Sequence, residues 1–290
     1  MDFITFCRLH GLLIDYLPPI GVWKRYPTED HPRKRNGAAK YMGTHGFVQN
    51  HAIETEVSVW KSDDPRLDVA RIQRDASAAR RRMIQDQQAA ADKAAWIVSR
   101  CTHNTHPYLE ARGFPKETGL VWHTDGTQLL VIPMRDAGHL VGCQLIDPDG
   151  TKRFLKGQRT AGASFCINNH GPIILVEGYA TGLAVQHAMR QLRRPYTLHV
   201  CFSAGNLTAI AKRFRDGLVI ADNDKSGTGE AAAKATGWSY WMSDQVGEDA
   251  NDTYRRLGAF RFSQSLLKVI ARAVATSPAA RPGPSFATRG

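Results

Sequence analysis

The stretch Ile173–Tyr179 reads IILVEGY, and Leu218–Asp224 reads LVIADND. Each is a short run of branched apolar residues followed by acids, which is typical of a buried strand in a parallel sheet. A third apolar run, Thr197–Phe202, lies between them, and the segments that join the three runs have helical character. This order predicts a β-α-β-α-β unit whose strands end at one edge of the sheet, where α/β proteins bind ligands.

Three acids are expected at that edge: Glu177, Asp222 and Asp224. Carboxylates that converge repel one another, and each raises the pKa of the others unless a cation neutralises them. Carboxylate oxygens that leave room for waters and phosphates suit Mg²⁺ or Mn²⁺. We therefore predict a metal site for phosphate chemistry. The competing interpretation, that these acids only cap the following helices, does not require three acids on two strands.

These residues resemble a known family. Glu177, the triplet Asp222–Asp224 and the glycine-rich helix start Ser226–Gly229 are similar to a Toprim domain, the metal-binding fold of bacterial-type primases, topoisomerases and some nucleases. The resemblance covers about residues 171–258. It implies a Rossmann-like parallel sheet with flanking helices, in which Glu177, Asp222 and Asp224 are catalytic and hold Mg²⁺ or Mn²⁺.

The composition supports an intracellular protein with an acidic partner. A chain of 290 residues, 42% of them hydrophobic, can form one large domain or two to three small ones with a proper core. Its net charge of +11 favours nucleic acid as the partner. The five scattered cysteines contain no Cys-x-x-Cys pair, as expected of free thiols in a reducing cytosol. Without a signal peptide or a run of about 20 apolar residues, we expect a cytoplasmic protein that does not enter a membrane.

Residues 1–62 are predicted to form a small β-rich unit. Phe3–Leu17 has the pattern of an apolar helix that Pro18 and Pro19 would stop. The short runs Gly46–Val48 and Val57–Trp60 suggest hairpins. Bacterial primases carry a zinc ribbon at the matching position, but three histidines here lack Cys partners at metal spacing: His31, His45 and His51. No zinc ligands are predicted, and activity is expected not to depend on zinc.

Residues 63–104 are predicted to be a helical spacer. The segment 66–99 is rich in Ala, Gln and Arg and free of Gly and Pro, which favours one long helix. The cluster Arg80–Arg82 could serve nucleic-acid recognition instead, and this alternative stays open.

Residues 105–170 are predicted to be a β-rich subdomain. A short helix over Tyr108–Phe114 precedes the runs Leu129–Pro133, Leu140–Ile146 and Lys152–Leu155, which turn signals separate into an antiparallel meander. The order Tyr-Leu-x-x-Arg-Gly, Ile-Pro-Met-Arg-Asp, Gly-x-x-x-Gly-Cys-Gln resembles the subdomain that precedes Toprim in bacterial primase cores. The plasmid- and phage-borne branch is the most similar, whereas topoisomerases and Toprim nucleases lack this block.

Further site residues follow from the resemblance. Four basic residues before the acidic strand are implied to face template or nucleotide phosphates, with ordinary surface charge as the alternative: Lys152, Arg153, Lys156 and Arg159. Asp249 and Asp252 match the acids that complete a second metal position, although Asp252 could equally cap a helix. Thr181 stands where many family members carry an acid, which puts the metal count in doubt.

The chain is expected to end in a helix, 259–276, and a disordered tail, 277–290. The helix would pack through Leu266, Leu267 and Ile270. No Gly-x-x-x-x-Gly-Lys-Ser/Thr motif occurs, so no P-loop helicase is predicted within the chain.

The resemblance implies a DNA primase that makes short RNA primers on single-stranded DNA for phage or plasmid replication. Its expected partners are the single-stranded DNA template, nucleoside triphosphates and a separate replicative helicase. Two alternatives remain open: a Toprim-type nuclease using the same acids on water, and a non-catalytic accessory that binds single-stranded nucleic acid. A topoisomerase is excluded because the chain is too short for its gate domains.

Overall fold

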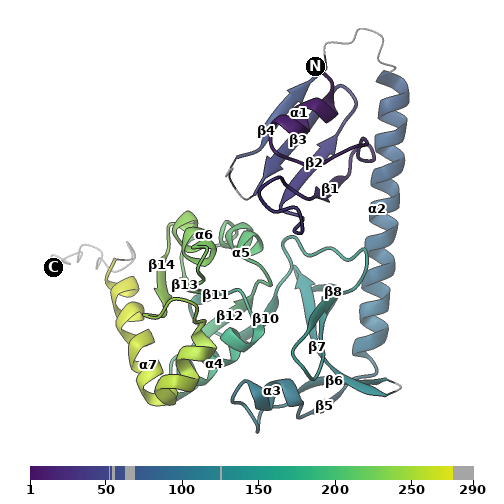
Figure 1. Cartoon of the computed structure of the whole chain (residues 1–290). Coiled ribbons are helices and arrows are strands. Elements are labelled where there is room, and N and C mark those ends of the chain that lie inside the picture. Colours follow the sequence, from purple (N-terminus) through teal and green to yellow (C-terminus); the bar gives the residue numbers. More distant parts are fainter. Residues whose placement is uncertain (52, 54–55, 63–68, 125, 277–290) are drawn as a thin grey trace, which may run out of the picture. The chain divides into compact units, whose positions relative to one another are not determined.

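The computed structural model describes residues 1–51, 53, 56–62, 69–124 and 126–276 (Figure 1). The chain divides into two compact units, Met1–Asp86 and Gln87–Gly290. The expected tail at 277–290 and the first residues of the expected spacer, 63–68, lie outside the described residues. Within the described ranges, no helix combines the length and the apolar character that crossing a membrane requires.

The first unit contains the helix α1 (Phe3–Leu9) and a four-stranded antiparallel sheet in the order β1-β2-β3-β4. The strands are β1 (Trp23–Tyr26), β2 (Gly37–Tyr41), β3 (His45–Asn50) and β4 (Ser58–Lys61). α1 covers one face, where Phe3 packs against Trp60. A Cβ atom at Gly46 would lie 2.2 Å from the Phe3 ring, so this contact requires glycine.

The helix predicted over Phe3–Leu17 is wrong in its extent. α1 ends at Leu9, and Gly11 follows in the left-handed conformation with φ +72°. Leu12 then pairs with Thr28 in an isolated β-bridge. Glycine reaches a positive φ without steric cost, so it ends the helix well before Pro18.

The long helix α2 (Val69–Val98) matches the one predicted from composition. Its last turns belong to the second unit, where Ala90, Ala94 and Ile97 pack on a β-meander. The meander has five antiparallel strands in the order β5-β6-β7-β8-β9: β5 (Thr102–Asn104), β6 (Gly119–Thr124), β7 (Thr127–Asp136), β8 (His139–Ile146) and β9 (Lys152–Phe154). β5 and β6 were not predicted. The short helix α3 (Pro107–Ala111) connects β5 and β6.

A second five-stranded sheet has the order β10-β12-β11-β13-β14. Its strands are β10 (Phe165–Asn169), β11 (Ile173–Val176), β12 (Tyr196–Val200), β13 (Leu218–Ala221) and β14 (Ser239–Met242). The four strands from β12 to β14 are parallel, as the sequence predicts, and β10 is an unpredicted antiparallel edge strand.

Four helices flank this sheet: α4 (Tyr179–Gln191), α5 (Ala204–Ala211), α6 (Thr228–Thr236) and α7 (Ala250–Thr276). α4 and α7 pack on one face, and α5 and α6 on the other. α7 is broken at Gly258, where the backbone has φ 76° and ψ 162°. The fold is therefore mixed α/β, with two antiparallel sheets and a mixed, largely parallel sheet between helices.

The meander and the mixed sheet share one hydrophobic core. Tyr108 and Leu109 of α3 pack in the same buried cluster as Val121 and Ile132 of the meander and Val176 of β11. This packing holds the ends of β8 and β9 close to the edge at which β11 and β13 end.

Candidate functional site

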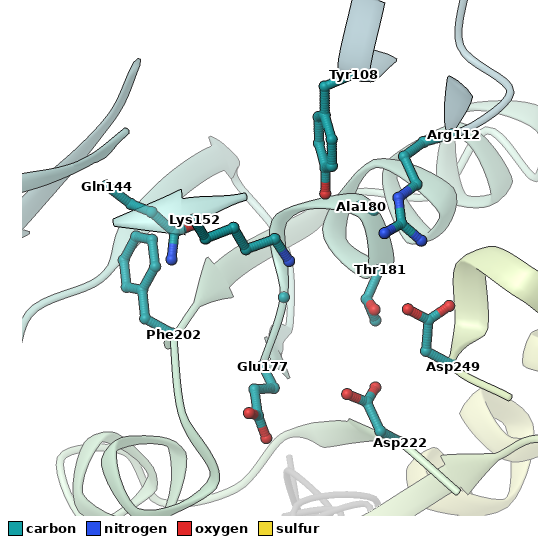
Figure 2. A pocket seen from close by; sticks show the side chains of 11 residues that line it. Tyr108, Arg112, Gln144, Lys152, Glu177, Ala180, Thr181, Phe202, Asp222 and Asp249 are labelled. Atoms are coloured by element: carbon teal, nitrogen blue, oxygen red, sulfur yellow. The ribbon is translucent and has the colours of Figure 1, made fainter. Parts of the chain in front are cut away.

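A cavity of about 200 Å³ opens at the end of β11, within the second unit (Figure 2). Its wall is formed by α3, two meander strands, the start of α4, and the segments that follow β11, β12 and β13 and precede α7: Tyr108, Arg112, Gln144, Lys152, Glu177, Gly178, Ala180, Thr181, Phe202, Asp222 and Asp249. Three acids, two basic residues and a tyrosine therefore face one space.

Strand register explains how two of the acids meet. β11 and β13 are adjacent and parallel, with Val176 opposite Ile220. Glu177 and Asp222 follow these strands, so they leave the sheet at the same edge, as the sequence predicts. Gly178 caps the N-terminus of α4, whose positive dipole end thus faces the cavity and favours an anionic ligand.

Asp222 is the most perturbed acid in the cavity. Burial, with the charges of Asp249, Glu177 and Asp224, raises its pKa to about 7, and Lys152 opposes this shift. Its Oδ1 atom is buried and accepts no hydrogen bond from any described residue. A buried carboxylate oxygen without a donor is costly unless a ligand satisfies it.

Glu177 and Asp249 share this environment. Burial raises the pKa of both carboxyls, and the Asp224 charge adds to the shift of Glu177. In Figure 2 the Arg112 guanidinium points toward the Asp249 carboxylate, and its charge offsets part of the Asp249 shift. The three pocket acids Glu177, Asp222 and Asp249 thus form an electronegative wall that favours a bound cation.

Asp224 has a different setting from the three pocket acids. Its Oδ1 accepts hydrogen bonds from the backbone N–H groups of Ser226, at 2.8 Å, and Thr228, at 3.3 Å, and its Oδ2 accepts one from Gly229 at 2.9 Å. Burial opposes the shift, but these hydrogen bonds hold the pKa of Asp224 below its ordinary value. The side chain therefore caps the start of α6, and it does not line the cavity.

Asp252 also acts in a helix cap. Its Oδ2 accepts from the Asp249 backbone N–H at 3.2 Å, while its own N–H donates to Asp249 Oδ1 at 2.8 Å. This reciprocal pair is a capping-box arrangement at the start of α7. Asp249 thus has one oxygen engaged by the helix and still lines the cavity.

We expect Asp224→Asn to separate the two interpretations of Asp224. Asparagine keeps one acceptor oxygen for the backbone N–H groups of Ser226, Thr228 and Gly229 but removes the charge. If Asp224 only orders this helix start, the free energy of unfolding should fall by about 1 kcal/mol, because one acceptor is lost, while nucleotide incorporation stays near wild type. A loss of incorporation as large as that caused by changing Asp222 would instead identify Asp224 as a metal ligand.

Lys152 is the only one of the four predicted basic residues that lines the cavity. Partial desolvation and the Arg112 charge lower the pKa of Lys152, whereas Asp249, Asp222 and Glu177 oppose this. Its Nζ atom lies 5.9 Å from the centre of the Tyr108 ring. Figure 2 shows this amino group pointing into the space that the acids border.

The other three predicted basic residues lie elsewhere. Arg153 is paired with Asp147 at 2.7 Å, and Arg159 forms an ion pair with Asp136. Lys156 is exposed. The four basic residues are close together in the sequence, but only Lys152 lies beside the acids in the structure.

Sequence reasoning did not assign several of the cavity residues: Tyr108, Arg112, Gln144 and Phe202. Tyr108 and Arg112 were visible as the Tyr-Leu-x-x-Arg-Gly motif, which marked a resemblance but gave them no role. Gln144, on a meander strand, was likewise visible only as the last residue of the Gly-x-x-x-Gly-Cys-Gln motif, because its approach to the acids depends on how the two sheets pack.

Tyr108 offers a test of whether the cavity is built for a ligand. Its hydroxyl group is buried and has no hydrogen-bond partner among the described residues. Tyr108→Phe should therefore leave the free energy of unfolding unchanged or slightly higher, because removing an unpaired buried hydroxyl costs nothing. If the hydroxyl contacts a ligand, nucleotide incorporation should nevertheless fall about tenfold, the value of one hydrogen bond to a charged group. Unfolding and incorporation assays on the same preparation check both parts.

The carboxylate oxygens of the cavity suit a hard divalent cation whose remaining ligands are waters and substrate phosphates. Among the described residues, no group of three or more His, Cys, Asp or Glu side chains is arranged to hold a metal ion by itself. Mg²⁺, however, is usually bound through one or two carboxylates together with waters and substrate phosphates. The unpartnered Asp222 Oδ1, with Glu177 and Asp249 across the same cavity, fits that mode.

Comparison with known proteins places the chain among primase relatives. No protein-family model matches it. Two curated proteins of Escherichia coli, each a DNA primase TraC, are 27% and 29% identical to it over 199 residues. The chain is a primase homologue. The alignments cover 62% of this chain but only 18% and 13% of the relatives, so the chain spans less than a fifth of the length of these primases.

Solved structures of primases are also among those to which the chain is similar. A complex of bacteriophage T7 lagging-strand DNA polymerase with primase domains of two gp4 subunits, bound to an RNA/DNA hybrid and dTTP, matches with a TM-score of 0.43 and 15% identity, covering 60% of this chain and 93% of that one. A DNA primase domain from Pseudomonas aeruginosa matches with a TM-score of 0.37 and 16% identity, covering 61% and 58%. These likenesses are too distant to transfer the role of any residue.

Proposed function

We propose that this chain is a DNA primase of the plasmid- and phage-borne type, with a Toprim domain over residues 171–258 and the meander as its primase-core subdomain. It would synthesise short RNA primers on single-stranded DNA by nucleotidyl transfer. The observation that carries the proposal is the convergence of Glu177, Asp222 and Asp249 with Lys152 in one cavity of a primase homologue.

The pocket acids would hold Mg²⁺ or Mn²⁺. Asp222 is the principal ligand, because its Oδ1 is buried without a donor, and Glu177 and Asp249 complete the electronegative wall. A bound metal would favour ionisation of the attacking 3′-hydroxyl and neutralise charge on the triphosphate and on the leaving pyrophosphate. Asp224 and Asp252 stay second candidates, since their carboxylates are engaged in helix caps.

The basic side of the cavity would bind the anionic substrate. Lys152 is positioned to neutralise triphosphate oxygens, and Arg112 balances Asp249 on the opposite side. The N-terminus of α4 adds its positive dipole to the same space. α3 and α4 pack in one core, and β9 pairs with β8, so these groups are preorganised before a ligand enters.

One experiment separates the proposal from its two rivals. The full chain is incubated with single-stranded DNA, labelled nucleoside triphosphates and Mg²⁺ or Mn²⁺, and the products are sized. A primase yields labelled RNA of a few nucleotides or more. Shortened DNA without incorporation would identify a nuclease, whereas DNA binding without either product would identify a non-catalytic accessory. A replicative helicase as partner is a further proposal, tested by its effect on primer yield.

A further inference from the structure

The four-stranded sheet of the N-terminal unit has one covered face and one open face. α1 covers the first, where Phe3 packs with Tyr41 and Trp60. Side chains alternate between the two faces of a strand, so the residues next to Tyr41 and Trp60 in their strands belong to the other face, and the strand register places residues of β1 and β3 beside them. We define the open face by six residues: Trp23, Arg25, Lys40, Phe47, Val59 and Lys61.

The strand register aligns aromatic and basic side chains in a row across the open face. Trp23 lies opposite Lys40, Lys40 opposite Phe47, and Phe47 opposite Val59. The rings of Trp23 and Phe47 are 6.3 Å apart between centroids. Trp23 and Val59 keep 47% and 53% of their surface exposed, so the row is accessible to a ligand. A row in which apolar side chains alternate with a basic one suits a ligand that has both flat apolar groups and negative charge.

All formal charge on these four strands is positive. They carry Lys or Arg at four positions and no Asp or Glu. Three of the four, Arg25, Lys40 and Lys61, belong to the open face, and the described ion pairs include none of them. The fourth, Lys24, belongs to the covered face, where its Nζ donates to the Tyr16 hydroxyl at 3.1 Å. The exposed charge thus complements a polyanion.

We propose that the open face binds single-stranded DNA, with bases stacked on Trp23 and Phe47 and phosphates held by Arg25, Lys40 and Lys61. Exposed aromatic rings beside cations are how proteins bind single strands without reading sequence. A duplex fits less well, because its bases are already stacked on one another. The choice of DNA rather than RNA rests on the proposed function, but the surface itself is built from residues that take no part in the acidic cavity.

The test measures binding of the full chain to a labelled oligothymidylate of about 12 nucleotides by fluorescence anisotropy. Trp23→Ala should weaken binding roughly tenfold or more, the value of stacking one base. The double change Lys40→Ala and Lys61→Ala should lower the slope of log affinity against log salt by about 1.4, since each phosphate contact on a single strand contributes about 0.7. The control Lys24→Ala removes a charge from the same sheet but from its covered face, and it should leave the slope unchanged.

A second variant distinguishes stacking from a structural role. Trp23→Phe keeps an aromatic ring, so affinity should stay within about threefold of wild type, while the part of the tryptophan emission that DNA quenches should decrease. Unchanged affinity in a folded Trp23→Ala, Phe47→Ala double variant would overturn the proposal. So would equal affinity for duplex DNA, tighter binding of oligouridylate at this face, or self-association lost in the double variant with no change in DNA binding.

The proposed function and this surface can fail separately. Asp222→Asn leaves the open face unchanged, so it should bind the oligothymidylate with wild-type affinity even if it makes no primer. Conversely, the open-face variants should still extend nucleotides at saturating template if the cavity is the catalytic centre. Loss of DNA binding in Asp222→Asn would move the binding site to the cavity and contradict the inference.

Discussion

Asp222→Asn is expected to lower primer synthesis by several orders of magnitude while the chain stays folded. Asparagine keeps the shape of the side chain but removes the negative charge from the centre of the acidic wall. Charge stabilisation by a bound metal supplies several kcal/mol, and each ~1.4 kcal/mol is tenfold in rate. Incorporation of labelled nucleotides on single-stranded DNA measures the effect. Wild-type synthesis by the variant would end the assignment of Asp222 as a metal ligand.

The same variant has a pH-dependent signature in the absence of metal. The pKa of Asp222 rises from 3.8 to about 7 on folding, so between these values the native chain binds more protons than the unfolded chain. Stability from this group is therefore present at low pH and is lost as pH rises toward about 7. Unfolding by urea in the presence of chelator should show Asp222→Asn gaining more stability over wild type at about pH 8 than at about pH 5, where the loss from wild-type Asp222 is only partly developed. If the variant and wild type differed in free energy of unfolding by the same amount at both pH values, the pKa of Asp222 would not be raised by folding.

The sequence predicted the parts of the site that depend on strand order. Two apolar runs, each followed by an acid, were sufficient to place Glu177 and Asp222 at one sheet edge, because adjacent parallel strands end together. It did not distinguish Asp224 from Asp222, since both follow β13 by a few residues. Only the turn at Ser226 shows that the Asp224 carboxylate faces the N–H groups of α6, whereas that of Asp222 faces the cavity.

The remaining cavity residues depend on packing between sheets, which periodicity does not report. Lys152 and Arg153 are adjacent in sequence, yet successive residues of a strand point to opposite faces. One reaches the acids, and the other pairs with Asp147. The edge strand β10 was missed for a related reason: FCINN carries polar residues and pairs antiparallel to β12, so it lacks the apolar run of the buried parallel strands.

The second large effect is expected at Lys152. Its ammonium is the positive charge that offsets both Glu177 and Asp222, and it lies on the side of the cavity opposite to them. Lys152→Met keeps the aliphatic stem but removes the charge, so the packing near Tyr108 should persist. Loss of a preorganised charge that faces a transferring phosphoryl group costs roughly 10²- to 10³-fold in kcat. Lys156→Met, which removes an exposed charge four residues further on, is the matched control and should change kcat by less than about threefold.

Two measurements decide what Lys152 binds. If it neutralises the triphosphate, Lys152→Met should lower incorporation while the salt dependence of single-stranded DNA binding stays at the wild-type slope. If it contacts the template instead, that slope should fall by about 0.7, the contribution of one phosphate contact on a single strand. Equal activity of Lys152→Met and Lys156→Met would show that the ammonium in the cavity takes no part in the reaction. Because Lys152 lines the cavity with Arg112 and the three pocket acids, whereas Lys156 does not line it, we expect the first result.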